Sequence, residues 1–443
     1  MTSTVSETVE LPYAGTALPD LLQRVGSPTV AIVGLGYVGL PTAVGLAHHG
    51  VRVVGFDVSL QRLQAIRDQS VDLTASDRAR LDEALQHDLL VLTDHADMLR
   101  NADAIIICVP TPVDEHLHPD LTALRAACST VIAHATLGQL IVLTSTTYVG
   151  CTNDLLVAPL EARNLVVGRD VFVAFSPERI NPGADALPQE SVPRVVGGHT
   201  PACAERADRL IRSISQHVHF VSSPEAAEMS KLQENIFRAV NIALANELAD
   251  VAGGLGLDPI EVLNAAATKP YGFMPFRPGP GVGGHCIPCD PHYLLWQLRG
   301  GAVQAPLIEQ AMTSISRRPF QVVDRVVSGL ADAGIPRVGA RILVVGVTYK
   351  SGVEDVRESP ALIIIERMLE LGMHVEFTDP LVHTLKLGNR VLTSRQPSPE
   401  LARSVDLVVL HTRQPADDHT WLRCATPVLD TSYGLAFENC AHL

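Results

Sequence analysis

The apolar positions in the first part of the chain come in short runs that alternate with amphipathic stretches. The run at 28–34, PTVAIVG, is rich in β-branched residues and leads through glycines into a helical pattern over 41–49. A second strand pattern follows at 51–57, VRVVGFD, and similar apolar runs occupy 104–109 and 140–143. Strands that alternate with helices in this way predict a parallel sheet covered by helices on both faces.

The pattern changes in the middle of the chain. From about 223 to 267, alanine, leucine and glutamate recur at helical spacing without a strand-like run. We therefore predict that this region is helical. A loop rich in glycine and proline, 269–288, interrupts the helical pattern before it resumes at Pro291.

A strand–turn–helix–strand order returns from Arg341 onward. The strand pattern RILVVG is followed by a polar turn, the helical stretch PALIIIERMLELG and a second strand, MHVEFTD. The segments 34–57 and 346–379 therefore look like diverged copies of one βαβ unit. The second copy lacks closely spaced glycines after its first strand, so we do not expect it to hold a dinucleotide in the same way.

These patterns predict an α/β protein with two Rossmann-like doubly wound domains joined by a central helical region. The length of 443 residues is sufficient for each domain to have its own core. The predicted limits are an N-terminal arm at 1–27, a dinucleotide-binding domain at 28–220, a central helical region with a cysteine loop at 221–318, and a C-terminal Rossmann-like domain at 319–443.

Composition narrows the possible partners. The formal net charge of −14 argues against broad binding to nucleic acid or to an anionic membrane. Eight cysteines are too sparse for a disulfide scaffold in a chain of this length. The N-terminus shows no secretory-signal pattern, and no uncharged apolar run reaches the roughly 18 residues of a membrane span. We expect a protein of the reducing cytoplasm, with neither nucleic acid nor membrane as its partner.

A dinucleotide-binding motif follows the first predicted strand. Its G-x-G-x-x-G pattern is Gly34-Leu35-Gly36-Tyr37-Val38-Gly39. The glycines permit a tight turn and a close approach of pyrophosphate, whose charge the N-terminus of the next helix favours. Asp57 ends the second strand, where a carboxylate can accept hydrogen bonds from a ribose diol and repel the 2′-phosphate of NADP, so NAD is favoured. Arg62 could lie near the adenosine ribose, so NADP remains possible as the cofactor. The alternative interpretation of the motif is a purely structural glycine turn.

The segment 281–290, GVGGHCIPCD, predicts a reactive thiol at Cys286. Three glycines before this cysteine remove side chains from its approach, so a bulky ligand could reach the sulfur. Pro288 and Asp290 suit the start of a helix, whose dipole would favour the thiolate. A nucleophilic cysteine beside a nicotinamide is useful when an aldehyde is oxidised to an acid, through a thiohemiacetal and then a thioester.

Other interpretations of this cysteine segment remain. Cys286 and Cys289 could form half of a zinc site, although no second Cys/His pair follows at the usual spacing, so no metal is expected. They could also form a redox pair, but thioredoxin-type motifs occur in a different context. A buried, inert cysteine would not need the flanking glycines.

Seven motifs occur in one order between about 28 and 435. Together they resemble the UDP-glucose/GDP-mannose dehydrogenases, which oxidise C6 of a nucleotide sugar to the uronic acid with two NAD⁺. The motifs are GLGYVGLP at 34–41, CVPTP at 108–112, STTYVG at 145–150, SPERINPG at 176–183, SKLQEN at 230–235, GVGGHCIPCD at 281–290 and YKSGVEDVRES at 349–359.

The resemblance implies catalytic roles at six positions. Cys286 would be the nucleophile, and Lys231 and Asn235, four residues apart on one helix face, would stabilise the oxyanions. Asp290 would assist proton transfer together with Lys231. Glu178 would activate the water that cleaves the thioester, and Thr146 would hold that water or the nicotinamide. Taken singly, Glu178 could simply pair with an arginine, and Lys231 could be a solvated helix residue.

The resemblance also implies binding residues and partners. NAD would be bound by Gly34, Gly36, Tyr37, Val38, Gly39, Asp57, Arg62, Thr111 and Arg357. A UDP-sugar would be bound by Glu178, Arg179, Lys231, Asn235, Phe276, Gly283 and Lys350. The last of these would belong to a nucleotide-sugar site formed with the C-terminal domain, and the central region would form a homodimer.

Several positions depart from the family pattern. Cys289, Cys151 and Val149 stand where relatives often have other residues, and we expect Cys289 to make Cys286 sensitive to oxidation. The segment FMPFRPGPGVGGHCIP looks more like the N-acetylhexosamine branch, such as UDP-N-acetylglucosamine 6-dehydrogenase, than like the UDP-glucose branch, although Arg277 replaces an expected aromatic residue.

Three functions remain open from the sequence. The first is a four-electron nucleotide-sugar dehydrogenase acting on a UDP-N-acetylhexosamine or on UDP-glucose. The second is a two-electron hydroxyacid dehydrogenase of similar fold, in which Lys231 is the base and Cys286 is incidental. The third is a catalytically silent sensor of nucleotide sugars, which would have little reason to keep the whole set of catalytic residues.

Overall fold

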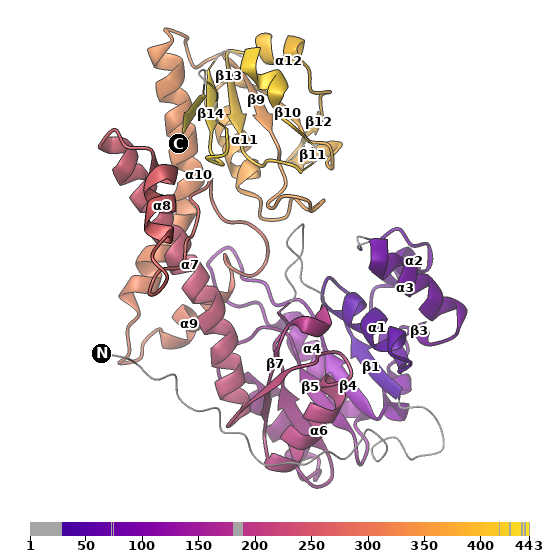
Figure 1. The fold of residues 1–443 in the computed structure, drawn as a ribbon. Coiled ribbons are helices and arrows are strands. Elements are labelled where there is room, and N and C mark those ends of the chain that lie inside the picture. Colours follow the sequence, from indigo (N-terminus) through magenta and orange to yellow (C-terminus); the bar gives the residue numbers. More distant parts are fainter. Residues whose placement is uncertain are drawn as a thin grey trace.

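The computed structural model describes residues 29–442, except 72, 74, 180–188, 416, 425, 426, 436, 438 and 439. The predicted arm at 1–27 and the second half of the SPERINPG motif lie outside these residues. Within them, two α/β domains are joined by a helical middle region, which confirms the predicted architecture (Figure 1). No helix of the described chain is both long and apolar enough to cross a membrane.

The first domain is built on an eight-stranded sheet in the order β3-β2-β1-β4-β5-β6-β7-β8. The first six strands follow the order of a dinucleotide-binding sheet. The strands are β1 Thr29–Val33, β2 Arg52–Phe56, β3 Leu90–Thr93, β4 Ala104–Ile107, β5 Leu140–Leu143, β6 Phe172–Phe175, β7 Arg194–Gly198 and β8 Val218–Val221. The helices are α1 Gly39–His48, α2 Leu60–Arg67, α3 Ala75–Gln86, α4 Thr122–His134, α5 Ala158–Ala162 and α6 Pro201–Ile211.

One edge of the sheet departs from the parallel arrangement. β1 to β6 are parallel, but β7 runs antiparallel to β6, and β8 then runs parallel to β7. A parallel connection needs a crossover segment, usually a helix. Between β6 and β7, the described residues contain only a short 3-10 helix, Gln189–Ser191. The strands expected from the sequence, β1, β2, β4 and β5, are parallel as predicted, and the antiparallel step at β7 lies in a part of the sheet for which no strand was predicted.

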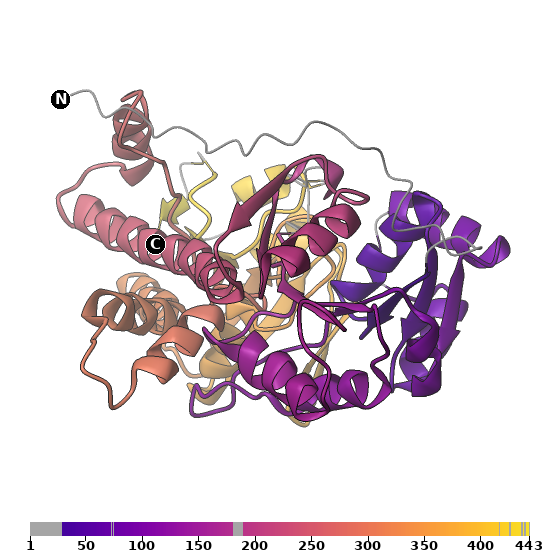
Figure 2. The same ribbon diagram turned by 90° about the horizontal axis from the view of Figure 1, so that it is seen from below.

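The middle region consists of long helices, as the pattern predicted. α7, Pro224–Gly254, begins at Ser223, whose side chain accepts from the N–H of Ala226. α7 packs along α10, and in Figure 2 both extend away from the first sheet. The other helices here are α8 Pro259–Ala267 and α9 Asp290–Leu298, and α10 spans Pro306–Asp332. The expected domain limit at 318/319 falls within α10, which is one continuous helix. The domain limits therefore stay a prediction.

The C-terminal domain has a parallel five-stranded sheet in the order β10-β9-β13-β14-β15. Its strands are β9 Arg341–Val345, β10 His374–Thr378, β13 Leu407–Leu410, β14 Val428–Asp430 and β15 Cys440–His442, with a separate antiparallel pair, β11 Thr384–Leu387 and β12 Arg390–Thr393. Its helices are α11 Pro360–Glu370 and α12 Pro399–Arg403.

The two sheet domains repeat one local arrangement. The N–H of Leu35 donates to the carboxylate of Asp57 over 2.8 Å, and the N–H of Val347 donates to Asp379 over 2.8 Å. In each case the donor follows a glycine with positive φ at the end of the first strand. These matching bonds confirm that 34–57 and 346–379 are copies of one βαβ unit.

Candidate active site

Glycine is required at the three positions of the dinucleotide motif for different reasons. A Cβ atom at Gly34, which has a φ of +89°, would lie 2.8 Å from the carbonyl oxygen of Cys108. A Cβ atom at Gly39 would lie 1.8 Å from the carbonyl oxygen of Gly34, so the helix can approach the strand only without a side chain. Gly36 has no atom within 4 Å of such a Cβ. The fold does not require a glycine there, but an approaching pyrophosphate does.

The surroundings of this loop fit a dinucleotide. α1 begins at Val38 without a side-chain cap, so no side chain competes with a phosphate for the start of the helix, although the N–H of Leu40 donates to the carbonyl oxygen of Gly36 over 3.1 Å. The Asp57 carboxylate accepts from the N–H groups of Leu35 and Ser59 over 2.8 and 2.9 Å. Each carboxylate oxygen still has a lone pair for a ribose hydroxyl. Arg62 donates from Nε to the carbonyl oxygen of Leu35 over 2.8 Å, which holds its side chain against the same loop.

The cysteine loop ends in a turn that opens α9. The N–H groups of Cys289 and Asp290 both donate to the carbonyl oxygen of Cys286, over 3.2 and 2.8 Å. Cys286 is exposed, whereas Cys289 is buried and its thiol pKa is raised to about 12, mainly by burial. The two cysteines thus occupy different environments within one turn.

The thiol of Cys286 is not activated in the way that the sequence suggested. Desolvation by the surrounding protein and the nearby Asp290 carboxylate raise its pKa. The positive charges of Lys231 and Arg238 oppose this increase without reversing it. The net shift of this pKa is therefore opposite to the direction expected from the helix terminus alone, and a proton acceptor must assist the sulfur.

The glycines before Cys286 were predicted to open an approach to the sulfur, but the structure gives them another role. A Cβ atom at Gly283 would lie 2.6 Å from the carbonyl oxygen of Glu358, and one at Gly284, where φ is +77°, would lie 2.9 Å from the ring of Tyr349. The side chains of Tyr349 and Tyr37 are hydrogen-bonded. These glycines therefore let the C-terminal domain pack closely against the cysteine loop, rather than leaving open space beside the sulfur.

Asp290 lies at the centre of a buried polar cluster. Its carboxylate accepts from the side-chain amide of Asn235 on α7 and from the hydroxyl of Thr146, which follows β5. Burial raises the pKa of Asp290 to about 6, although Lys231, Asn235 and Thr146 act in the opposite direction. A carboxyl group with this pKa can exchange a proton near neutral pH. The structure thus brings together four residues that the sequence placed in one site.

Lys231 connects this cluster with the segment after β6. Its ammonium donates to the backbone carbonyl of Glu178 over 2.7 Å, so it is not a solvated helix residue. The side chain of Glu178 forms a buried ion pair with Arg194 over 2.6 Å. The alternative in which Glu178 pairs with an arginine is thus observed. Arg179 donates from its backbone N–H to the Glu178 carboxylate and pairs with Glu234.

The segment after β4 packs against the helix of the cysteine loop. The hydroxyl of Tyr293, on α9, donates to the carbonyl oxygen of Thr111 over 3.0 Å. The N–H of Val113 donates to the sulfur of Cys289. Thr111, an expected NAD contact, is therefore fixed relative to the turn that carries Cys286.

The remaining expected binding residues lie around the cysteine loop. Arg357 forms a bidentate pair with Asp355, which is the main cause of the raised pKa of its guanidinium, and Tyr349 and Tyr37 contribute in the same direction. The pair thus lies beside the dinucleotide loop. Phe276 packs edge-on against Phe237 of α7, with ring centroids 5.8 Å apart. Lys350 follows Tyr349 directly, and its carbonyl oxygen accepts from Thr348.

Three residues in this region were missed by the sequence reasoning. Arg238 follows Lys231 by seven residues and so shares its helix face, a spacing that could have identified it. Arg194 and Tyr349 act through contacts with residues far away in the sequence, at Glu178 and Gly284. No spacing rule would have found those two.

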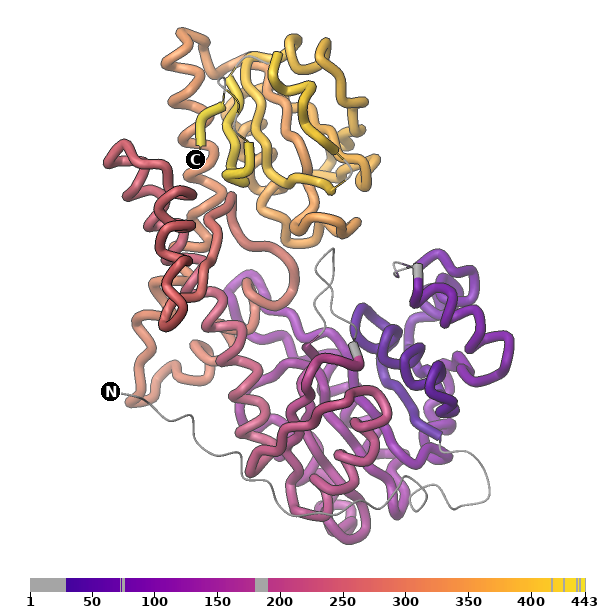
Figure 3. The backbone as a smooth tube through the Cα atoms, viewed as in Figure 1, coloured from indigo at the N-terminus to yellow at the C-terminus, as the bar shows by residue number. Residues whose placement is uncertain are grey.

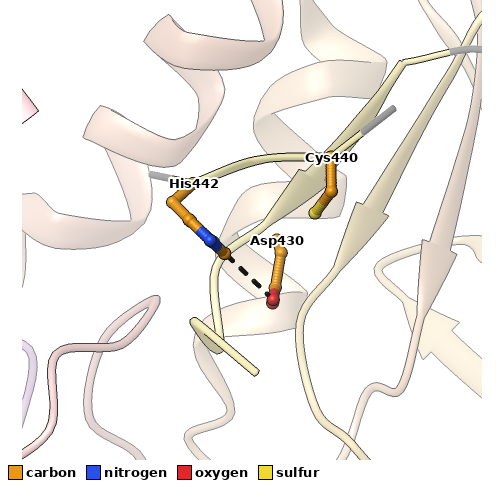
Figure 4. Close-up of side chains that lie close together, drawn as sticks. All are labelled: Asp430, Cys440 and His442. Atoms are coloured by element: carbon orange, nitrogen blue, oxygen red, sulfur yellow. Dashed lines mark ion pairs between the residues drawn. The ribbon is translucent and has the colours of Figure 1, made fainter. Parts of the chain in front are cut away.

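A cluster of possible metal ligands, Asp430, Cys440 and His442, lies in the C-terminal domain (Figure 4). Its ligand atoms lie within 4.8 Å of one another, but Asp430 already accepts from Ser432 and from two backbone N–H groups, those of Gly434 and Leu435. Burial and Asp430 raise the pKa of the Cys440 thiol to about 12. The carboxylate therefore anchors the turn after β14.

The fold and this site define an oxidoreductase with a dinucleotide-binding domain. Models of the UDP-glucose/GDP-mannose dehydrogenase family match the chain in order, with the NAD binding domain at residues 28–215, the central domain at 225–315 and the UDP binding domain at 343–431. The chain belongs to this family. Its cofactor is NAD, and its C-terminal sheet domain corresponds to the UDP binding domain.

Individual relatives agree with this assignment. UDP-N-acetyl-D-glucosamine 6-dehydrogenase of Pseudomonas aeruginosa is 39% identical over 80% of this chain and 83% of its own length. UDP-N-acetyl-D-mannosamine dehydrogenase of Pyrococcus horikoshii is 36% identical over 80% of this chain and 84% of its own. A solved structure of the UDP-D-ManNAc dehydrogenase from that organism has a TM-score of 0.85 at 31% identity, covering 94% of this chain and 98% of the other.

Proposed function

We propose that this protein oxidises the C6 hydroxyl of a UDP-N-acetylhexosamine, such as UDP-N-acetylglucosamine, to the uronic acid. The observation that carries this proposal is the convergence of Asp290, Asn235, Thr146 and Lys231 beside Cys286. A two-electron oxidation of an alcohol needs a proton acceptor but no thiol. A cysteine becomes necessary when the aldehyde is carried on to the acid.

Two oxidation steps share the same residues. Gly36, Asp57 and the start of α1 would hold NAD⁺, which would supply the hydride acceptor for both steps. In the first step Lys231 would give one of its ammonium protons to the Asp290 carboxylate, which releases it to solvent before the second step, and would take the proton of the C6 hydroxyl as the aldehyde forms. The sulfur of Cys286 then forms a bond to C6, its proton passes to Asp290, and the aldehyde oxygen becomes the thiohemiacetal oxygen.

The second step produces a thioester that water must cleave. Lys231 and the second N–H of the Asn235 amide would stabilise the negative oxygen at C6. Glu178 would accept a proton from the attacking water, and the C6–sulfur bond would break to give the carboxylate and the Cys286 thiol. The ion pair with Arg194 fixes the position of the Glu178 carboxylate.

The nature of the sugar is inferred from the relatives. Two of them, at 39% and 36% identity, have names that specify UDP-N-acetyl-D-glucosamine and UDP-N-acetyl-D-mannosamine. Arg238 lies near Cys286 and could bind a sugar substituent. UDP-glucose is the alternative substrate. Rates of NADH formation with UDP-GlcNAc, UDP-ManNAc, UDP-glucose and GDP-mannose test this choice, and a preference for UDP-glucose or GDP-mannose would overturn it.

The two-electron alternative differs in stoichiometry. A four-electron dehydrogenase produces two NADH for each sugar consumed, and a hydroxyacid dehydrogenase produces one. We expect two NADH together with a uronic acid, and no uronic acid from Cys286→Ser. One NADH per sugar, or an unchanged rate of uronate formation in this variant, would reject the thioester route. A protein that binds UDP-sugars and forms no NADH would be the silent sensor.

We also propose that α7 forms a homodimer interface. Five apolar side chains recur along it at intervals of seven, four, three and four residues, and each is between 45% and 71% exposed: Phe237, Leu244, Leu248, Val251 and Leu255. An apolar stripe of this length on a soluble surface is typical of an interaction site. Leu248→Glu should give monomers in light scattering, whereas Leu137→Glu, at an exposed position of the first domain, should stay dimeric. A monomeric wild type would contradict the proposal.

A further inference from the structure

The loop before Cys286 has few fixed points. Residues 268–275 are all exposed, and the loop then bends toward the C-terminal domain before it reaches α9 (Figure 3). Between Phe276 and Cys286, Gly279 is the point at which the middle helices hold the backbone. Its N–H donates to the side-chain carbonyl of Asn246 over 2.8 Å, and its carbonyl oxygen accepts from Nε of Arg318 over 3.0 Å.

Arg318 is unusual because it is a charged side chain with only 1% of its surface exposed. Its Nη1 donates to both carboxylate oxygens of Asp250 over 2.8 Å and to Gln321 over 3.2 Å. Its Nη2 donates to the hydroxyl of Tyr433 over 3.4 Å. A buried arginine with a rigid planar group can fix several partners in one geometry. Here it connects α7, α10, the cysteine loop and the C-terminal domain.

Neighbouring contacts support the same arrangement. Pro319, the next residue of α10, lies 3.4 Å from a Cβ atom built at Gly281, and Pro360 of the C-terminal domain lies 2.9 Å from it. Gly281 itself has a φ of +144°, which other residues rarely adopt. The loop is thus held at Gly279 by polar contacts and at Gly281 by close packing between the two parts of the molecule.

We propose that Arg318 is a positioning residue for Cys286, a role that rests on the proposed function of that cysteine. By fixing Gly279 relative to both Asp250 and Tyr433, Arg318 sets where the turn at Cys286 lies with respect to Lys231 and Asp290. Arg318 does not touch the reacting atoms. Its effect reaches the sulfur through the six residues of loop between Gly279 and Cys286.

The test compares Arg318→Met, Arg318→Lys and the control Arg317→Met, whose site is exposed on the same helix. Misplacement of a reacting group by about 1 Å can cost up to about a hundredfold in rate. We expect Arg318→Met to lower kcat by about tenfold or more, with KM for NAD⁺ within about twofold of wild type. Arg318→Lys should recover part of kcat, and Arg317→Met should behave as wild type.

A second measurement separates positioning from general stability. The pH midpoint for alkylation of Cys286 by iodoacetamide, followed by mass spectrometry of its peptide, depends on how near Asp290 and Lys231 lie. We expect Arg318→Met to shift this midpoint. A variant with a lowered melting temperature but an unchanged midpoint and kcat would show a structural role only and overturn the proposal.

The alkylation experiment tests the positioning role of Arg318 separately from the proposed oxidation of a UDP-sugar. Alkylation needs no substrate, so the midpoint tests Arg318 even if no UDP-sugar is oxidised. If Arg318→Met does not fold, Arg318→Lys keeps the positive charge but loses the planar group that reaches Gly279, Asp250 and Tyr433 together, so it should shift the midpoint and lower kcat to a smaller degree. An Arg318→Lys protein with wild-type midpoint and kcat would then overturn the proposal.

Discussion

The carboxylate of Glu178 lies 2.6 Å from the guanidinium of Arg194, and both side chains are buried. A buried pair of this kind can be structural, since its loss leaves an uncompensated charge and costs about 3–5 kcal/mol. It can also hold a carboxylate at the place where a proton must be accepted. The two roles differ in what accumulates when Glu178 is altered.

Glu178→Gln should separate hydrolysis from oxidation. If Glu178 activates water, the variant should form two NADH per active site in a rapid burst and then stop, because the thioester on Cys286 persists. Mass spectrometry of the quenched protein should show the added uronyl group. Glu247→Gln, at an exposed site on α7, should turn over normally. A destabilised Glu178→Gln protein that shows no burst and no covalent adduct would assign this glutamate a purely structural role.

Asp290→Asn should change stability and activity in opposite directions. The folded-state pKa of Asp290, about 6, is above its ordinary value of 3.8, so the folded state binds its proton more tightly than the unfolded state does. The charged carboxylate therefore destabilises the fold above pH 6 by up to about 3 kcal/mol. The variant should be more stable than wild type in urea at pH 8, and the difference should disappear below about pH 4.

The same substitution should alter the pH profile of the reaction. In the wild type, kcat/KM for the UDP-sugar should rise with pH through an apparent pKa near 6, as Asp290 becomes able to accept a proton. Asp290→Asn should lower kcat and lose this limb. An acid limb that persists unchanged in the variant would show that another group titrates there.

Gly36→Ala and Gly39→Ala should have different consequences, although both belong to the same motif. The side chain added at Gly36 meets no atom within 4 Å, so the free energy of unfolding should change little, while KM for NAD⁺ should rise by about tenfold or more as pyrophosphate loses its approach. The side chain added at Gly39 would overlap the carbonyl of Gly34 and should destabilise the fold. Equal NAD⁺ affinity in Gly36→Ala and wild type would contradict a pyrophosphate site at this glycine.

The sequence was informative where structure depends on local pattern. Strand runs such as 28–34, the glycine motif and the helix that carries Lys231 and Asn235 all have periodicities or turn residues that identify them. The duplicated βαβ unit was visible for the same reason. Partner choice between distant segments has no such signature, so neither the pairing of Glu178 with Arg194 nor the packing of Tyr349 on Gly284 could be read from the chain.

The raised pKa of Cys286 is a second property that depends on tertiary packing and could not be predicted from the local sequence. The proximity of a helix start was correctly predicted, and its dipole alone would favour the thiolate. Desolvation by the surrounding protein and the charge of Asp290 have the larger effect on this pKa, and both depend on the final packing around the cysteine loop. Local sequence therefore indicated an exposed cysteine at a helix start but gave the wrong direction for the pKa of its thiol.

Cys289→Ser should change how the protein responds to peroxide. Peroxide converts the thiolate of the exposed Cys286 to a sulfenic acid, and the thiol of Cys289, in the same turn, can condense with it to form a disulfide and water. Activity lost by the wild type should then return with dithiothreitol. In Cys289→Ser the sulfenic acid has no neighbouring thiol, so oxidation should proceed to the sulfinic acid and activity should not return. Cys424→Ser, which removes an exposed cysteine in the C-terminal domain, should behave as wild type. Matching courses of inactivation and recovery in wild type and Cys289→Ser would mean that burial, which raises the Cys289 pKa to about 12, keeps that thiol out of the oxidation chemistry.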